Sequence, residues 1–209
     1  MLKLVIGTRN LKKREELVEL LSREWPCHLP LKLQGIEDYP DLPEVEEDGE
    51  TFQENAIKKA TTVAKLTGEW AVAEDSGLEV DALGGAPGVR SARYAGEVTG
   101  PRPPEAAYKE NNLKLLKAMK GIPPERRTAR FRCVIALASP EGLLFVVEGQ
   151  CEGLVSQEAR GEQGFGYDPV FYLPGYGKTF AELGPAVKNQ VSHRAQALKK
   201  FRERLREFI

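Results

Sequence analysis

A short aliphatic segment followed at once by an amphipathic one opens the chain, and this order limits the folds that it can adopt. Leu2–Ile6 is rich in aliphatic residues and fits a short buried strand. Residues 7–10 form a turn, and apolar residues gather on one side of residues 11–24, which is typical of a helix. Asn10 is a suitable N-cap for that helix. A strand that leads directly into a helix predicts an α/β fold.

The alternation of strand and helix continues farther along the chain. Thr51 and Glu54 have the spacing of a capping box, which predicts the start of a second helix. A second short strand is expected over residues 70–73, ending at the acidic turn 74–77. The other expected elements are a helix over 104–120, strands over 129–138 and 143–155 joined as a hairpin, a last helix capped by Ser192 and running to about 208, and loops over 27–50 (with at most one strand), 84–100 and 157–168.

Length and composition limit the domain count and the function classes. The 209 residues, 41% of them hydrophobic, suffice for one domain over residues 1–209, which we expect to have two lobes, the second built on the hairpin. Lys and Arg number 30 and Asp and Glu 31, a balance that argues against a nucleic-acid partner. No segment approaches the roughly 18 apolar residues of a membrane span, and the first residues do not resemble a secretory signal. We therefore expect a cytoplasmic protein without membrane contact.

Cysteine and histidine are too scarce for a disulfide framework or a zinc centre. The three cysteines are an odd number and form no C-x-x-C pair, and there are two histidines. Any metal would therefore be held by carboxylates.

Two glycine-containing segments look like nucleotide-binding motifs and are rejected. Residues 175–179 end like a P-loop, but Tyr172 stands where its first glycine belongs, and no helical pattern is expected after it. Residues 164–166 begin like a dinucleotide fingerprint, but Pro169 replaces its third glycine.

The first segment with chemical potential is the turn after the first strand. Its residues are Thr8, Arg9, Asn10, Leu11, Lys12 and Lys13. A helix N-terminus presents unpaired N–H groups and a partial positive charge, which suit a phosphate, and Lys13 could point at the same anion. The alternative is an ordinary Asn-capped helix with two solvated lysines.

Acidic residues form the second candidate. Glu74 and Asp75 end a hydrophobic strand, where ligands bind in open α/β sheets. Mg²⁺ prefers carboxylate oxygens and keeps several waters, so these acids could hold it and orient a water molecule. A carboxylate from the acidic run, with Glu44 and Glu47 both possible, could complete the site. A plain polar turn at 74–77 is the alternative.

Two further segments combine aromatic, glycine and cationic residues. In the first, Gly166 lets the backbone approach a ligand and Phe165 offers a stacking surface, although a simple glycine turn is the alternative. In the second, cations lie near the start of the last helix, where they could face an anion or a carbonyl. The candidate residues of the two segments are Phe165, Gly166, Tyr167, Asp168, Lys188, His193 and Arg194.

The four candidates together form the parts of a metal-assisted nucleotide hydrolase, and at this point the sequence resembles a known family. The chain resembles the inosine triphosphate pyrophosphatases, also called XTP/dITP diphosphatases, in their bacterial branch. The matching stretches are TRNLKKREEL at 8–17, ETFQENAIKKA at 50–60, AEDSGLEVDALGGAPGVRSARYAG at 73–96, GFGYDPVF at 164–171, KTFAEL at 178–183 and VSHRAQAL at 191–198.

The resemblance implies an ITPase-like α/β fold, with an elongated mixed sheet, two lobes and a central cleft. It implies hydrolysis of XTP, ITP and dITP to the monophosphate and pyrophosphate, which removes these triphosphates from the nucleotide pool. It also implies that the enzyme uses Mg²⁺ and is a homodimer. The small-molecule substrate would be a purine nucleoside triphosphate.

The resemblance also assigns roles to residues. Thr8, Asn10 and Lys13 would hold the triphosphate. Asp75 would be general base and metal ligand, with Ser76 touching the substrate. The remaining implied roles are base and sugar contacts for Phe165 to Asp168, closure on the phosphates or purine oxygens for Lys188, His193 and Arg194, metal binding for Glu74 and for Glu44 or Glu47, and a weaker substrate role for Lys59.

Two residues depart from the family pattern, because many members have a small residue at Arg9 and an aspartate at Glu74. A competing hypothesis from a different class is a purine-nucleotide sensor with the same pocket and no turnover. The adjacent acids 74 and 75 favour the enzyme, because a sensor of a polyanion gains little from added negative charge.

Overall fold

The computed structural model describes residues 2–23, 30–96 and 103–209, which fold into two compact units. The first unit contains residues 1–75, 133–149 and 194–209, and the second contains residues 76–132 and 150–193. Glu24 of the first predicted helix and residues 27–29 and 97–100 of two predicted loops lie outside the described residues.

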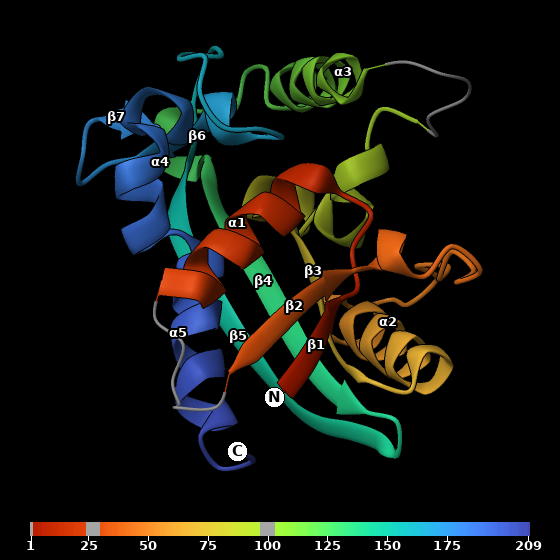
Figure 1. The fold of residues 1–209 in the computed structure, drawn as a ribbon. Coiled ribbons are helices and arrows are strands. Elements are labelled where there is room, and N and C mark those ends of the chain that lie inside the picture. Colours follow the sequence, from red (N-terminus) through yellow and green to blue (C-terminus); the bar gives the residue numbers. More distant parts are fainter. Residues whose placement is uncertain (1, 24–29, 97–102) are drawn as a thin grey trace. The chain divides into compact units, whose positions relative to one another are not determined.

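Parallel strands and their crossover helices build the first unit (Figure 1). β1 (Leu2–Ile6) pairs in parallel with β2 (Leu31–Gly35) on one side and β3 (Trp70–Val80) on the other. Parallel neighbours need a long connection, and the helices α1 (Leu11–Arg23) and α2 (Phe52–Thr67) lie in these two connections. The sequence of β1 and its short turn therefore place the start of α1 at the carboxyl end of the strand.

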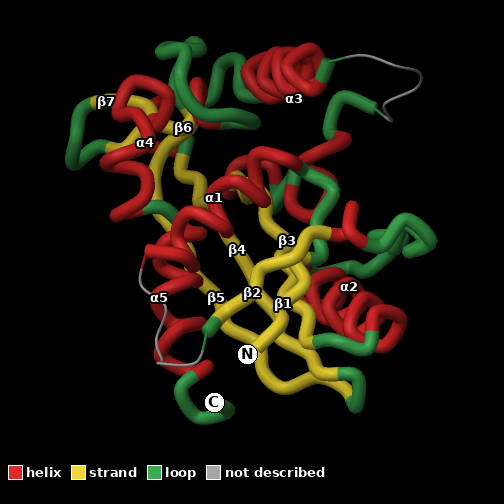
Figure 2. The backbone as a smooth tube through the Cα atoms, in the orientation of Figure 1, coloured by secondary structure: helices red, strands yellow, loops and turns green. Residues whose placement is uncertain are grey.

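The second unit is mainly antiparallel. Its strands β6 (Phe171–Leu173) and β7 (Lys178–Thr179) extend the sheet from β5 by antiparallel pairing, as the tube in Figure 2 shows. The whole sheet has the order β2-β1-β3-β4-β5-β6-β7. The remaining elements are β4 (Thr128–Ser139), β5 (Gly142–Val155), α3 (Pro104–Ala118), α4 (Phe180–Val191) and α5 (His193–Leu205), with short 3₁₀ turns that include Gly88–Arg93. The predicted mixed α/β fold is confirmed.

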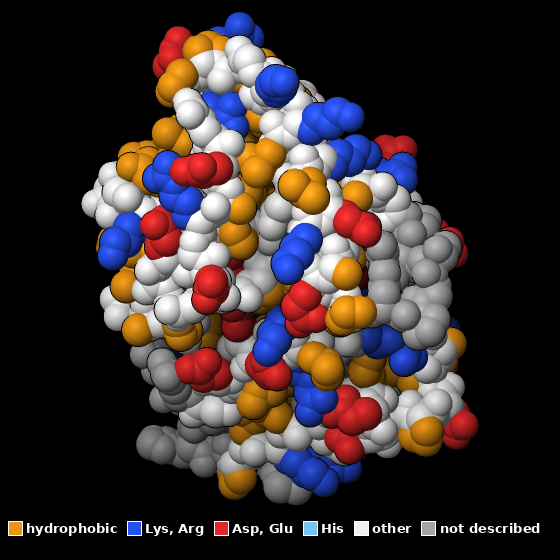
Figure 3. All heavy atoms as spheres, turned by 90° about the horizontal axis from the view of Figure 1, so that it is seen from above, with side chains coloured by type: hydrophobic (Ala, Val, Ile, Leu, Met, Phe, Trp, Pro, Cys, Tyr) orange, Lys and Arg blue, Asp and Glu red, His pale blue; other side chains and the backbone are white. Residues whose placement is uncertain are grey.

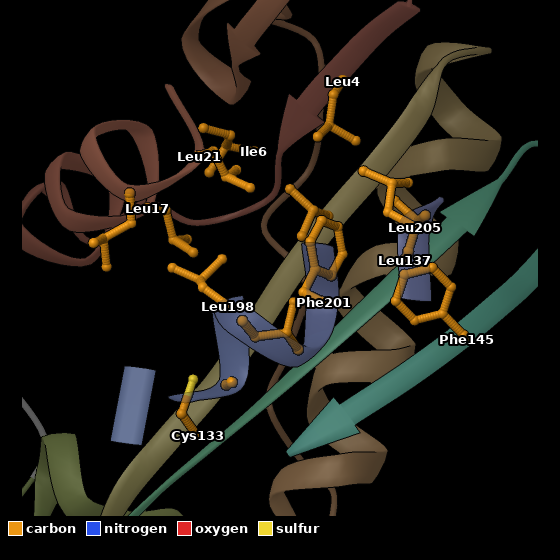
Figure 4. Close-up of a cluster of buried hydrophobic side chains, with 14 residues drawn as sticks. Leu4, Ile6, Leu17, Leu21, Cys133, Leu137, Phe145, Leu198, Phe201 and Leu205 are labelled. Carbon is orange, nitrogen blue, oxygen red and sulfur yellow. The ribbon is translucent and has the colours of Figure 1, made fainter. Parts of the chain in front are cut away.

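Each unit has its own hydrophobic core. In the first, Leu17 and Leu21 of α1 meet Phe201 of α5 over the strands (Figure 4). In the second, Phe171 and Phe131 pack with ring centroids 4.6 Å apart. The apolar side that the sequence pattern assigned to the first helix is thus buried.

Most predicted elements are confirmed, and one strand boundary is wrong. The capping box is present, with Thr51 Oγ1 accepting from the Glu54 N–H at 3.1 Å. The predicted end of the second strand at Ala73 is wrong, because β3 continues to Val80. Glu74 and Asp75 are buried within it, which is possible because basic side chains surround them, as described below.

A helix after the KT segment was missed. Thr179 caps α4 by accepting from the Glu182 N–H, and Gly184 interrupts the helix at a φ of 73° just before Pro185. Gly184 and Pro185 interrupt the helical pattern of this segment, which is why the sequence did not predict the helix. The expectation that no helix follows residues 175–179 is therefore wrong. The P-loop is still excluded, because Tyr172 occupies the position of its first glycine.

Charges of both signs are interspersed on the surface, as Figure 3 shows for one face. The nearly equal numbers of acidic and basic residues agree with this distribution. Within the described residues, no helix is both long and apolar enough to cross a bilayer.

Two phenylalanines that contact the same ring allow a test of the first core. Phe201 and Phe208 each lie with ring centroids 5.3 Å from Phe145, but Phe201 is 0% exposed and Phe208 is 36% exposed. Phe201→Ala should lower the free energy of unfolding by about 3–5 kcal/mol because it leaves a cavity, and Phe208→Ala by less than about 1.5 kcal/mol. Denaturant unfolding followed by circular dichroism measures both, and equal losses would contradict the assignment of the core.

Candidate functional site

The turn between β1 and α1 is an ordered helix start. Asn10 Oδ1 accepts a hydrogen bond from the Lys13 N–H at 3.1 Å, so the predicted N-cap is confirmed. Thr8 Oγ1 accepts from the Asn10 N–H at 3.2 Å. The turn is therefore held by its own side chains, while the helix N-terminus keeps the positive potential that suits an anion.

The side chains of Arg9, Leu11 and Lys12 have surface positions. Arg9 Nη2 donates to the carbonyl oxygen of Leu42 at 3.0 Å, and Lys12 pairs with Glu15 at 3.1 Å on the exposed face. Leu11 is exposed. Arg9 therefore ties the turn to the loop that precedes α2.

Lys13 points inward to a buried network of charges. Its Nζ lies 3.6 Å from Glu74 Oε1. Both oxygens of Glu74 accept from Arg194, from Nε and Nη2 at 2.7 Å each, and Arg194 Nη1 donates to Glu16. Glu74 and Arg194 are almost fully buried, and the Cys133 Sγ approaches Glu74 Oε2 at 3.5 Å. Two acids and two bases thus balance one another in the first unit.

Burial and ion pairing act in opposite directions on the pKa values of this network. Burial alone would lower the pKa of Lys13, but Glu74 and Asp75 outweigh it and the net pKa is raised. For Arg194, burial is likewise outweighed by Glu74 and Glu16, and the pKa lies well above its usual value. Both bases are therefore held in their charged forms.

Asp75 follows Glu74 on β3 and has different neighbours. Its Oδ2 accepts from Asn55 Nδ2 at 3.0 Å, and its Oδ1 lies 3.7 Å from Lys59 Nζ, which also contacts Glu47. Burial raises the pKa of Asp75, although Lys59 and Lys13 counteract the rise. A buried carboxylate with a raised pKa is a better proton acceptor than an exposed one.

Helix α2 positions this second cluster. Asn55 and Lys59 are four residues apart, so they lie on the same face of the helix, and both are buried. Asn55 Oδ1 also accepts from the Gly49 N–H at 2.8 Å, which fixes the loop that contains Glu47. Glu44, the alternative to Glu47, has an exposed side chain.

Aromatic and charged residues form another cluster in the second unit. Lys188 Nζ pairs with Asp168 Oδ2 at 2.7 Å and lies 4.4 Å from the centroid of the Phe165 ring. Asp168 Oδ2 also accepts from the Phe165 N–H at 2.9 Å, and Tyr108 lies beside Phe165 with centroids 6.1 Å apart. Asp168 and Lys188 are buried, so this loop is fixed by an interior ion pair.

Hydrogen bonds from a neighbouring helix and loop hold the same segment. Asn112 Nδ2 of α3 donates to the Gly166 carbonyl oxygen at 3.0 Å, and the Tyr167 hydroxyl donates to the Ser91 carbonyl oxygen at 2.9 Å. Gly166 has a φ of 63°, a conformation that favours glycine.

His193 and Ser76 also belong to the second unit. The imidazole of His193 is buried and stacks on Phe131 with centroids 4.6 Å apart, whereas Ser76 is half-buried.

The predicted site residues therefore gather in two groups. The first unit contains Thr8, Arg9, Asn10, Leu11, Lys12, Lys13, Glu44, Glu47, Lys59, Glu74, Asp75 and Arg194, and the second contains Ser76, Phe165, Gly166, Tyr167, Asp168, Lys188 and His193. Sequence reasoning missed Glu16, Asn55 and Asn112. The spacing of Asn55 to Lys59, and of Lys13 to Glu16, on one helix face was an available signal.

The carboxylates of Glu47 and Asp75 are of the type that holds a magnesium ion. Glu47 and Asp75 approach the same ammonium group of Lys59, so a positive charge already lies between them. Over residues 2–23, 30–96 and 103–209, no group of three or more His, Cys, Asp or Glu side chains is placed to hold a metal. Mg²⁺ is commonly held by one or two protein carboxylates together with water and substrate phosphates, and this pair meets that requirement.

Comparisons with known proteins identify the family. The model of the Ham1 family matches residues 4–204. The chain belongs to the Ham1 family. A relative from Desulforamulus reducens, named dITP/XTP pyrophosphatase, is 54% identical over 97% of this chain and 94% of its own length. Another of that name, from Geobacter sulfurreducens, is 48% identical over 98% of this chain and 97% of its own length.

Solved Ham1 structures have the same fold. The Ham1 protein of Coxiella burnetii matches with a TM-score of 0.84 and 41% identity, covering 99% of this chain and 100% of that one. The Staphylococcus aureus Ham1 protein matches with a TM-score of 0.83 and 36% identity over 99% of this chain and 100% of that one. The family resemblance drawn from the motifs is therefore confirmed.

The buried network around Arg194 can be tested by its effect on stability. Arg194→Ala should lower the free energy of unfolding by about 3–5 kcal/mol, because Glu74 would remain buried without its strongest partner. Arg204→Ala is a matched control, because the Arg204–Glu207 pair is half exposed on both sides, and its loss should cost less than about 1 kcal/mol. Chemical denaturation of both variants measures the two free energies of unfolding. A loss for Arg194→Ala as small as that for Arg204→Ala would contradict the proposed charge balance.

Proposed function

We propose that this chain hydrolyses XTP, ITP and dITP to the nucleoside monophosphate and pyrophosphate. The observation that supports this most is the position of Asp75, a buried acceptor next to Asn55 and Lys59 in the unit that also contains the α1 start. The names of the relatives, dITP/XTP pyrophosphatase, support the same substrates and reaction.

In this proposal the first unit performs the phosphoryl chemistry. Thr8, Asn10 and Lys13, together with the N–H groups at the start of α1, bind phosphate oxygens. Asp75 accepts a proton from a water molecule, whose oxygen bonds to the α-phosphorus. The bond from that phosphorus to the bridging oxygen breaks, and pyrophosphate leaves with its charge countered by Lys13 and the helix N-terminus.

We assign the metal ligands to Asp75 and Glu47. Both carboxylates border Lys59, whereas both oxygens of Glu74 are engaged by Arg194. When bound, Mg²⁺ would neutralise charge on the triphosphate. The chain's own part is to keep the two carboxylates in place, through Asn55 and the loop that it fixes.

Purine recognition is assigned to the residues that resemble the family's base-binding motifs. Phe165 would stack on the purine base, and Asp168 and Lys188 would face the polar edge of the base. Arg194 and His193 stay predicted contacts of the purine oxygens or phosphates, where a donor facing a six-oxo group would reject the amino group of adenine. We also propose a homodimer and a cytoplasmic location.

The proposed base can be tested by removing one charge. Asp75→Asn should lower the rate of pyrophosphate release from ITP with Mg²⁺ by about 100-fold or more, because the amide cannot accept the proton. Asp48→Asn is the control, because Asp48 is exposed and pairs with Lys58, and it should stay within about twofold of the original rate. Release of monophosphate and pyrophosphate supports the enzyme, whereas tight ITP binding without product favours the sensor.

The choice between Glu47 and Glu44 can be tested separately. Glu47→Gln should raise the Mg²⁺ concentration needed for half-maximal activity by about tenfold or more, because it removes one of two ligands. Glu44→Gln should leave that concentration unchanged. The reverse ranking in a magnesium titration would show that the metal ligand is wrongly assigned.

A further inference from the structure

We propose that a cavity at the C-terminal end of α3 is a binding site for an organic phosphomonoester. The cavity has a volume of about 550 Å³, lies entirely in the second unit, and contains none of the residues assigned above to the reaction. Lys117, Lys120 and Arg127 are among its lining residues, and Leu116, Ile122 and Pro123 are among the apolar ones. Among the described residues that line it, none is Asp or Glu.

Arg127 is the central feature of this cavity. Its side chain lies in the interior, with the residue 6% exposed. Its Nε donates to the Val155 carbonyl oxygen at 2.7 Å, Nη1 to the carbonyl oxygens of Met119 and Ile122 at 2.8 and 3.3 Å, and Nη2 to that of Ser156 at 2.7 Å. A guanidinium has five N–H donors, so these four bonds leave one donor available.

All four acceptors are neutral carbonyl groups. In the part of the chain that the structure describes, no carboxylate lies within ion-pair distance of Arg127, unlike Arg194 with its two acids. Burial lowers the pKa of Arg127, as expected for a charge that lacks a nearby acid. A buried charge that is not neutralised costs free energy, and an anion in the adjoining cavity would supply the missing countercharge.

Two lysines that line the cavity add to its positive potential. Lys117 and Lys120 are exposed, and the Lys120 N–H donates to the Lys117 carbonyl oxygen at 3.2 Å in the turn that ends α3. Neither makes an ion pair within the described residues. Glu158, which follows the lining residue Gln157, pairs instead with Arg160 at 3.0 Å.

Size and apolar lining indicate the class of anion. The volume lies within the range of about 300–1,000 Å³ that is usual for small-molecule sites, which is far more than a phosphate group alone fills. Ile122 and the two prolines Pro123 and Pro124, which are half-buried or exposed, offer an apolar surface among the lining residues. An organic phosphomonoester, which joins a phosphate to an apolar body, matches both surfaces.

The test is a titration of the ¹⁵N-labelled full-length chain, followed through the backbone amides. Phenyl phosphate is the probe, with inorganic phosphate and phenol as its two halves. Phenyl phosphate should shift the amides of Gly121 and Gln157 to saturation, at a concentration at least tenfold below that needed for either half. Residues 8–13 serve as an internal reference, because an anion at the α1 start would shift them instead.

Paired variants identify the cations that bind the probe. Lys117→Gln combined with Lys120→Gln should weaken phenyl phosphate binding at Gly121 by at least tenfold. Lys65→Gln combined with Lys109→Gln removes two exposed lysines elsewhere and should leave it unchanged. Three outcomes would each overturn the proposal. They are equal binding of phenyl phosphate by both double variants, shifts confined to residues 8–13, and phenol binding as tight as that of phenyl phosphate. Because the readout is binding, its failure is independent of the proposed hydrolysis.

Discussion

The first unit depends on the compensation of two adjacent carboxylates that β3 brings into the interior. Each faces its own set of partners: Glu74 is bound by Arg194 and Lys13, and Asp75 by Asn55 with Lys59 nearby. Buried carboxylates without such partners would take up protons or unfold the strand. The bases therefore allow the strand to continue where a surface turn would otherwise be expected.

This compensation divides two roles between neighbouring residues. Glu74 has both oxygens engaged by a guanidinium, so it acts as a fixed anion that orients Lys13. Asp75 is held by an amide and lies near an ammonium group, which restrains its carboxylate while leaving its proton affinity raised. A single residue step along a strand, which turns successive side chains to opposite faces, is enough to produce this difference.

Local sequence signals predicted the elements that local interactions stabilise. The Asn10 cap, the Thr51 capping box and the β4–β5 hairpin are determined by residues close in sequence, and all three were predictable. The extension of β3 was not, because its buried Glu74 is neutralised by Arg194, which lies 120 residues away in the sequence. The helix α4 was hidden because Gly184 interrupts its period.

Prediction of the candidate site from the sequence has the same limit. Residue types and their order indicated phosphate and carboxylate chemistry, but only the fold revealed which side chains lie next to which. Asn55 belongs to a recognised segment, yet its two bonds, to Gly49 and to Asp75, depend on how the loop returns to the helix. The spacing of Glu16 to Lys13 could have indicated Glu16, but its partner Arg194 is at the other end of the chain and is revealed only by the fold.

The ammonium group of Lys59, between Glu47 and Asp75, has a consequence for any divalent ion that enters there. The ammonium group cancels about half of the negative charge of the two carboxylates, so a divalent ion would have to displace or share it. The net gain from capture is smaller than two bare acids would provide.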